Sequence, residues 1–240
     1  MAQQPGITYE AVVLWRKKRK NYSVYSFITP QLGIITCSVP HKQLQHLKSG
    51  GYLQAFSHVY ITVVPDGEYY KLQQVDGNFL VKSLEGDLDS IAYALFISDM
   101  MKSFFQKGQR DCDLYKLVLG FARQIQNKPV AFASIIMGWQ LLSHAGFVPS
   151  AGMYHFNKGV DTFLMEVYST TGMSLSREAQ AAMPILLNYS WSSNEVINLG
   201  KRTWLELEKV LFAYTMVQAD KELDAIVFIN EVGARLFPRE

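Results

Sequence analysis

The sequence predicts an α+β multidomain protein in which an N-terminal five-stranded OB-fold β-barrel precedes a mainly α-helical domain with a short β insertion. Five β-rich segments fall within the first third of the chain. The spacing of apolar residues then changes from alternation to recurrence at three and four residues, which is typical of helices. Hydrophobic residues make up 49% of the chain and charged residues 18%, as in globular proteins with a substantial core.

The five expected strands have the number and spacing of a small closed barrel. They cover residues 7–15, 22–30, 31–40, 55–64 and 68–76. The last two are joined by the turn Pro65–Glu68, in which proline presets φ and Gly67 accepts a positive φ. A barrel of this size favours an OB-fold. An SH3-like barrel has a similar strand count and stays open as an alternative.

Helical periodicity dominates the rest of the chain. The expected helices cover residues 89–108, 112–126, 130–146, 176–190, 192–200, 203–219 and 220–237. Between about residues 150 and 175 the helical pattern is broken, and residues 153–168 resemble a β-hairpin that turns at Lys158–Gly159. The chain therefore divides into an OB-fold domain, 1–84, and a helical domain, 85–240, with this hairpin-like insertion.

Charge is distributed unevenly between the two predicted domains. Residues 1–84 hold nine Lys and Arg against four acids, whereas residues 85–240 hold fourteen against seventeen. Such asymmetry indicates contact with a polyanion through the basic part. Five of the cations, Arg16 to Lys20, are consecutive and lie between the first two expected strands. Such a run is by default a solvated loop, but at the rim of an OB barrel it would contact phosphates.

Aromatic residues alternate along the same strands. OB-folds that bind single strands stack bases on aromatic side chains. Because successive strand residues face opposite sides, about half of these rings must point into the barrel. We expect Phe27 in the core and Tyr22 and Tyr70 at the surface.

The order of three motifs resembles the RecO family of bacterial recombination mediators. The motifs are GGYLQAFSHVYITVV at residues 50–64, WQLLSHAGFVPS at 139–150 and TGMSLSREAQAAM at 171–183. The resemblance implies a non-enzymatic mediator of DNA repair in the RecF pathway, cytoplasmic and nucleoid-associated. Such a protein binds single- and double-stranded DNA, anneals complementary strands and helps to load RecA on strands coated by single-stranded DNA-binding protein (SSB).

The resemblance also implies two protein partners, RecR and the acidic C-terminal tail of SSB. The tail would occupy a pocket in the helical domain. The candidate cations beside that pocket are Arg123, Lys128, Lys201 and Arg202. The candidate DNA-binding residues are Arg16, Lys17, Lys18, Arg19, Lys20, Tyr22, Lys42, Lys48, Tyr70 and Lys71.

The sequence departs from the family pattern in two places. Many members carry a four-cysteine zinc site after the second motif, whereas residues 151–172 contain no cysteine, so we expect neither metal nor cofactor. In the loop after the third strand, the family's Lys-Gly-Ala-Arg cluster is replaced by SVPHKQLQHLK, which keeps only Lys42 and Lys48. This change thins the basic surface of the barrel.

No motif indicates catalysis. The chain has no GxxxxGK[ST], HExxH or GxSxG pattern, and its short-spaced carboxylates precede expected helices, where they serve as caps. We therefore expect a protein that is not an enzyme. The two cysteines, Cys37 and Cys112, and the lack of a signal-peptide pattern indicate a reduced, cytoplasmic protein. A protein-interaction adaptor whose barrel no longer binds nucleic acid is the alternative, and an RNA-binding OB protein of translation is a third possibility.

Overall fold

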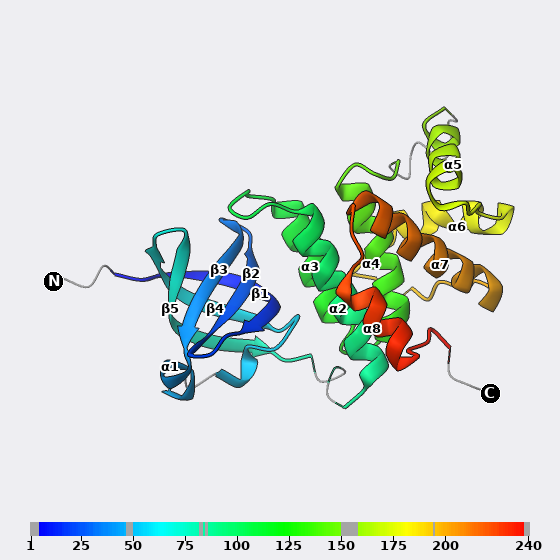
Figure 1. The fold of residues 1–240 in the computed structure, drawn as a ribbon. Coiled ribbons are helices and arrows are strands. Elements are labelled where there is room, and N and C mark those ends of the chain that lie inside the picture. The colour runs from blue at the N-terminus through cyan, green and yellow to red at the C-terminus, as the bar shows by residue number, and fades with distance from the viewer. Residues whose placement is uncertain are drawn as a thin grey trace. The chain divides into compact units, whose positions relative to one another are not determined.

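The computed structural model describes residues 5–46, 50–81, 84, 86–149, 158–193 and 195–237. The chain forms two compact units, and Figure 1 traces their elements. Unit 1 comprises residues 1–85 and 105–127, and unit 2 comprises residues 86–104 and 128–240. The expected change from strands to helices occurs between Phe79 and Leu88. The later segment 105–127, however, packs with the barrel in space.

Unit 1 is built on a closed five-stranded barrel. Its strands are β1 (Ile7–Lys18), β2 (Tyr22–Thr29), β3 (Gly33–Pro40), β4 (His58–Asp66) and β5 (Tyr69–Phe79). They follow one another around the barrel in the order β1-β2-β3-β5-β4, and β4 pairs with β1. The short helices α1 (His41–His46) and η1 (Gly50–Tyr52) connect β3 to β4. This arrangement confirms the OB-fold and excludes the SH3-like alternative.

The barrel closes through a parallel pair of strands, β3 with β5. Cys37 lies opposite Tyr70, and Ser38 lies opposite Lys71. Inside the barrel, Phe27, Val59 and other alternating apolar residues are fully buried, as the strand period requires. Burial also raises the pKa of the Cys37 thiol to about 12, so this cysteine stays protonated at neutral pH.

The helix α3 (Cys112–Gln124) packs on the outside of the barrel. Asp111 caps its first turn by accepting a hydrogen bond of 2.8 Å from the Leu114 amide. The Phe121 ring meets Phe56 edge to face, with 5.1 Å between centroids. The Phe56 amide in turn donates to the carbonyl of Val13 in β1 at 2.7 Å. These contacts make α3 part of the barrel unit.

Unit 2 consists of helices. These are α2 (Leu88–Phe104), α4 (Val130–His144), α5 (Lys158–Thr171), α6 (Arg177–Leu187), α7 (Lys201–Gln218) and α8 (Asp224–Val232). Helices α4 and α7 approach closely at Gly138, where a Cβ atom would lie 2.7 Å from a Leu211 methyl carbon. Within the ranges described above, no helix is both long enough and apolar enough to cross a membrane.

The expected β insertion is wrong for residues 158–171, which form the helix α5. Phe163 and Val167, four residues apart, are buried, while Met165 and Tyr168 are exposed. This is the period of a helix lying on a neighbour, and Phe163 packs edge to face on Tyr214 of α7. The remainder of the expected hairpin, residues 150–157, lies outside the described residues.

The helix expected over residues 192–200 is also wrong for its described part, which is every residue of that range but 194. Residues 195–200 have no regular secondary structure, and α7 begins only at Lys201. The segment runs beside α6, where Val196 and Ile197 line a surface groove. The asparagine and glycine in NLG, which end an apolar run here, favour an irregular connection over a helix.

The interior of unit 2 contains a carboxyl group with a shifted pKa. Glu208 of α7 accepts a hydrogen bond from the Tyr93 hydroxyl of α2. Burial raises the pKa of Glu208 above its usual value, although the Tyr93 bond partly opposes the shift. Burial and the nearby Glu208 carboxylate likewise raise the pKa of Tyr93.

We expect Glu208→Gln to flatten the pH dependence of stability above about pH 4.3, the ordinary glutamate pKa. A carboxyl whose pKa is raised on folding binds its proton more tightly in the folded state. Its stabilising effect is therefore complete below the unfolded pKa and is lost as pH rises through the folded pKa. Glutamine stays neutral and still accepts from Tyr93. Urea unfolding of parent and variant across pH measures the difference, and a parent that gains stability relative to the variant as pH rises would contradict the assignment.

Candidate nucleic-acid interface

A β-bulge in β1 determines where the basic residues point. Val13 pairs with Phe27 of β2, but the next pair is Trp15 with Ser26, so Leu14 is the extra residue. The bulge shifts the alternation of β1 by one residue. Trp15 and Lys17 consequently share the outer face with the even-numbered residues of β2.

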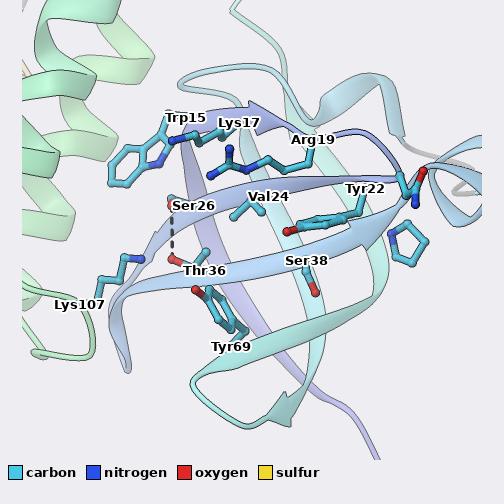
Figure 2. A pocket seen from close by; sticks show the side chains of 12 residues that line it. Trp15, Lys17, Arg19, Tyr22, Val24, Ser26, Thr36, Ser38, Tyr69 and Lys107 are labelled. Atoms are coloured by element: carbon cyan, nitrogen blue, oxygen red, sulfur yellow. Dashed lines mark hydrogen bonds between the residues drawn. The ribbon is translucent and has the colours of Figure 1, made fainter. Parts of the chain in front are cut away.

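That outer face carries a groove of about 660 Å³ across β1, β2 and β3. None of its lining residues is acidic, and three are cations: Lys17, Arg19 and Lys107. Figure 2 shows Trp15 and Lys107 toward one end of the groove, Tyr22 toward the other, and the Arg19 side chain extending between them. The complete lining is Trp15, Lys17, Arg19, Asn21, Tyr22, Val24, Ser26, Thr36, Ser38, Pro40, Tyr69 and Lys107.

The floor of the groove includes two hydroxyl groups that are buried and lie against each other. The hydroxyls of Ser26 and Thr36 lie 3.4 Å apart, and both side chains are more than 95% buried. The residues Tyr22 and Tyr69 are by contrast 42% and 46% exposed. A positively charged groove with exposed aromatic faces is the arrangement by which OB-folds hold nucleic acid.

Arg16 lies on the other side of β1. Its guanidinium donates two hydrogen bonds to Ser23 Oγ, at 3.2 and 3.1 Å, and its Cζ lies 5.5 Å from the centre of the Tyr25 ring. Burial raises the pKa of Tyr25, and the Arg16 charge opposes the shift. His41 Nε2 lies 3.3 Å from the same serine oxygen. Arg16 is therefore held in place by the barrel's own side chains.

The five-cation run is only partly a turn. Arg16, Lys17 and Lys18 belong to β1, and only Arg19 to Asn21 connect the strands, closed by a 2.8 Å bond from the Arg19 amide to the Tyr22 carbonyl. The expectation of a five-residue loop is wrong because β1 continues three residues beyond Trp15. Lys18 faces the Arg16 side, opposite Ser23, and Lys20 is exposed in the turn.

The structure also places the other candidate DNA-binding residues. Tyr22 lines the groove, but Tyr70 packs against the barrel core and its neighbour Tyr69 occupies the groove instead. Lys71 is exposed and lies opposite the groove residue Ser38. Lys42 is exposed on α1. Lys48 lies outside the described residues.

Sequence reasoning named Lys17, Arg19 and Tyr22 but missed the other aromatic and basic residues of the groove, which are Trp15, Tyr69 and Lys107. The alternation rule offers a signal for the two missed aromatic residues, because Trp15 lies two residues before Lys17 and Tyr69 two before Lys71. Lys107 had no such signal, because it reaches the groove from a segment that follows α2.

A comparison with protein-family models finds the family "Recombination protein O C terminal" over residues 85–224, which is more than half of the chain. The chain belongs to the RecO family. RecO membership implies a role in DNA recombination and repair. The comparison with curated proteins returned no match. The matched region begins after β5, the last strand of the barrel. The family match and the OB-fold barrel are therefore separate findings, because they rest on different parts of the chain.

The residues expected to bind a partner tail are divided between the two units. Arg123 belongs to α3 in unit 1, whereas Lys128, Lys201 and Arg202 belong to unit 2. The Lys201 ammonium lies 5.5 Å from the centre of the Phe237 ring. Arg202 is exposed in the first turn of α7.

Lys128 lies beside a second groove, formed by α6 and residues 195–199. Its ammonium donates to the Tyr189 hydroxyl at 2.5 Å and to the Glu195 carbonyl at 3.1 Å. Both partners line the groove, which also holds the exposed apolar side chains of Ile185 and Val196. A cation at the edge of an apolar groove suits an acidic peptide that ends in apolar residues.

No metal centre is found in the described part of the chain. There, no three His, Cys, Asp or Glu side chains are grouped closely enough to hold an ion. His58 is buried in β4 and bonds instead to Glu10, at 2.7 Å, and to Asn78, at 3.0 Å. Burial lowers the pKa of His58 despite the adjacent Glu10 carboxylate. These bonds join β4 to β1 and β5.

Proposed function

We propose that this RecO-family chain is a non-enzymatic mediator of recombinational repair that grips DNA in the groove of its barrel. The observation that carries the proposal is the groove itself, with three cations, three aromatic residues and no acid in its lining. Lysine and arginine neutralise phosphates irrespective of sequence. The protein would therefore bind single- and double-stranded DNA through the backbone, without base-edge readout.

Annealing follows from the same charges. Two complementary strands repel each other, and bound cations lower that repulsion, so pairing needs no ATP. By its resemblance to the RecO family, the protein would act in the RecF pathway with RecR and help RecA to replace SSB on single strands. We place it in the cytoplasm, associated with the nucleoid.

The acidic tail of SSB is the second proposed ligand. The groove between α6 and residues 195–199 supports this proposal, because Lys128 supplies a positive charge at its edge and Val196, 86% exposed, supplies apolar surface. Among the four cations expected beside a tail pocket, Lys128 bonds to two residues that line this groove, Tyr189 and Glu195. The proposed tail site therefore centres on Lys128.

The test of the function is fluorescence anisotropy of a labelled single strand of ~30 nucleotides across a salt series. We expect log K to fall linearly with log salt, at about 0.7 per neutralised phosphate. An RNA strand of equal length is the comparison that separates DNA repair from a role in translation. A protein that ignores DNA even at ~50 mM salt would contradict the proposal and favour the adaptor.

A further inference from the structure

The groove is completed by a segment that does not belong to the barrel strands. Residues 105–111, here called the linking segment, connect α2 to α3. Lys107 forms an isolated parallel bridge with Ile34 of β3, and the Gly108 amide donates to the Ile34 carbonyl at 2.9 Å. The Lys107 side chain thereby reaches the groove next to the first residues of β3 (Figure 2).

The linking segment lies against β3 at a distance that only glycine permits. Gly33 has φ +64°, and a Cβ atom there would lie 1.9 Å from the Gln109 carbonyl oxygen. At the end of the segment, Cys112 Sγ donates to the Pro30 carbonyl at 3.3 Å. The linking segment is therefore fixed to the barrel at Lys107 and at the residues that follow it.

Trp15 and Lys107 lie at the same end of the groove, with the Ser26 and Thr36 hydroxyls beside them (Figure 2). An indole gives a large apolar face on which a base can stack, and an ammonium attracts phosphate. A nucleotide combines the two groups that such a pair of side chains would bind. The base must be unpaired, because both faces of a base inside a duplex are already covered by its neighbours.

We propose that Trp15 and Lys107 form a nucleotide subsite for an unpaired strand, in which the base stacks on the Trp15 indole and its phosphate lies at the Lys107 ammonium. The subsite rests on the proposed function and adds a preference to it. Phosphate contacts serve single and double strands alike, but stacking on Trp15 adds affinity only for the single strand. The subsite would thus give the groove a preference for single-stranded over double-stranded nucleic acid.

The test uses the full chain and three variants: Lys107→Gln, Trp15→Leu and Trp15→Phe. Lys116→Gln is the matched control, because Lys116 is exposed on α3 of the same unit, outside the groove, and its loss changes the net charge equally. Labelled oligo(dT), oligo(rU) and a DNA duplex are titrated across a salt series. Thermal melting establishes that each variant is folded.

Three results are expected. Lys107→Gln lowers the salt slope on oligo(dT) by about 0.7, and Lys116→Gln leaves it unchanged. Trp15→Leu weakens oligo(dT) roughly 5- to 100-fold but leaves duplex affinity as it was, since one stacked base contributes that much. Trp15→Phe, which keeps an aromatic face, recovers most of the loss. Equal effects on oligo(rU) identify a subsite for any unpaired strand, and smaller ones a subsite for DNA.

Two outcomes overturn the subsite. One is a Trp15→Leu loss that is equal for single strand and duplex, and the other is a Lys107→Gln slope equal to that of the control. If Trp15→Leu does not fold, Trp15→Phe and Lys107→Gln decide, because Lys107 is exposed. A parent that binds no DNA contradicts the proposed function itself. If the parent binds DNA with a clear salt slope but Lys107→Gln and Trp15→Leu bind as the parent does, only the subsite is contradicted.

Discussion

Serine at all five positions 16–20 is expected to remove most of the salt dependence with which the chain binds a single strand. Each phosphate that a cation neutralises on a single strand contributes about 0.7 to the slope of log K against log salt. Removing several of these cations at once lowers the slope by about two to three units, and affinity at moderate salt falls by orders of magnitude. Anisotropy of the labelled strand with parent and variant measures the change.

Two double variants separate the sides of β1 at equal net charge. The double variant Lys17→Ser with Arg19→Ser removes two cations from the groove, one in β1 and one in the turn that follows it. Arg16→Ser with Lys18→Ser changes the other side, where Arg16 is already bonded to Ser23. We expect the first pair to lower the slope by about 1.4, as two phosphates require, and the second by much less. If the two double variants lower the salt slope equally, the side of β1 on which a cation lies does not decide whether it contacts DNA.

The barrel could be predicted because its strands obey a local rule. Alternation of apolar and polar residues, with the turn at Gly67 and its φ of +63°, defines β4 and β5 without any knowledge of their neighbours. The bulge at Leu14 could not be predicted in the same way. It depends on how β1 pairs with β2, and one extra residue reverses the direction of every later side chain.

The helix α5 was mistaken for a hairpin because its composition misleads. Phe163, Val167 and Tyr168 are residue types that favour strands, and Lys158–Gly159 resembles a turn. Packing decided otherwise: Glu166 accepts hydrogen bonds from Tyr214 and Gln218 of α7, at 2.9 and 2.8 Å. Those hydrogen bonds involve residues about fifty positions away, which a local pattern does not record.

The positive charge of the candidate site could be predicted from the sequence, but the full set of residues that line it could not. The cation run and Tyr22 stand out in the sequence, whereas Lys107 is an ordinary lysine between two helices. Its place in the groove depends on the close approach of Gln109 to Gly33, a backbone contact between distant segments. A long-range contact of this kind adds a functional residue without adding a motif.

Gln140→Leu is expected to be among the most destabilising substitutions in unit 2. The buried Gln140 amide of α4 donates to the carbonyls of Leu186, at 3.0 Å, and Tyr189, at 2.9 Å. Its oxygen accepts from Trp191 Nε1 at 2.6 Å. The Gln140 side chain thereby joins α4 to the end of α6 and to the residues that follow it, although the Leu186 carbonyl also accepts from the Tyr189 amide at 3.2 Å. Leucine fills a similar volume but makes none of these bonds.

A lost hydrogen bond costs roughly 0.5–1.5 kcal/mol, so the loss of these three bonds predicts a decrease of about 2–4 kcal/mol in the free energy of unfolding. Chemical denaturation followed by tryptophan fluorescence measures it. Gln180→Leu is the matched control in unit 2, because that half-buried amide makes a single bond to the Leu175 carbonyl and its loss costs about 1 kcal/mol. A loss from Gln140→Leu no larger than that of the control would show that water replaces the amide at the end of α6. The groove beside Lys128 would then not depend on Gln140, although Tyr189 contacts both residues.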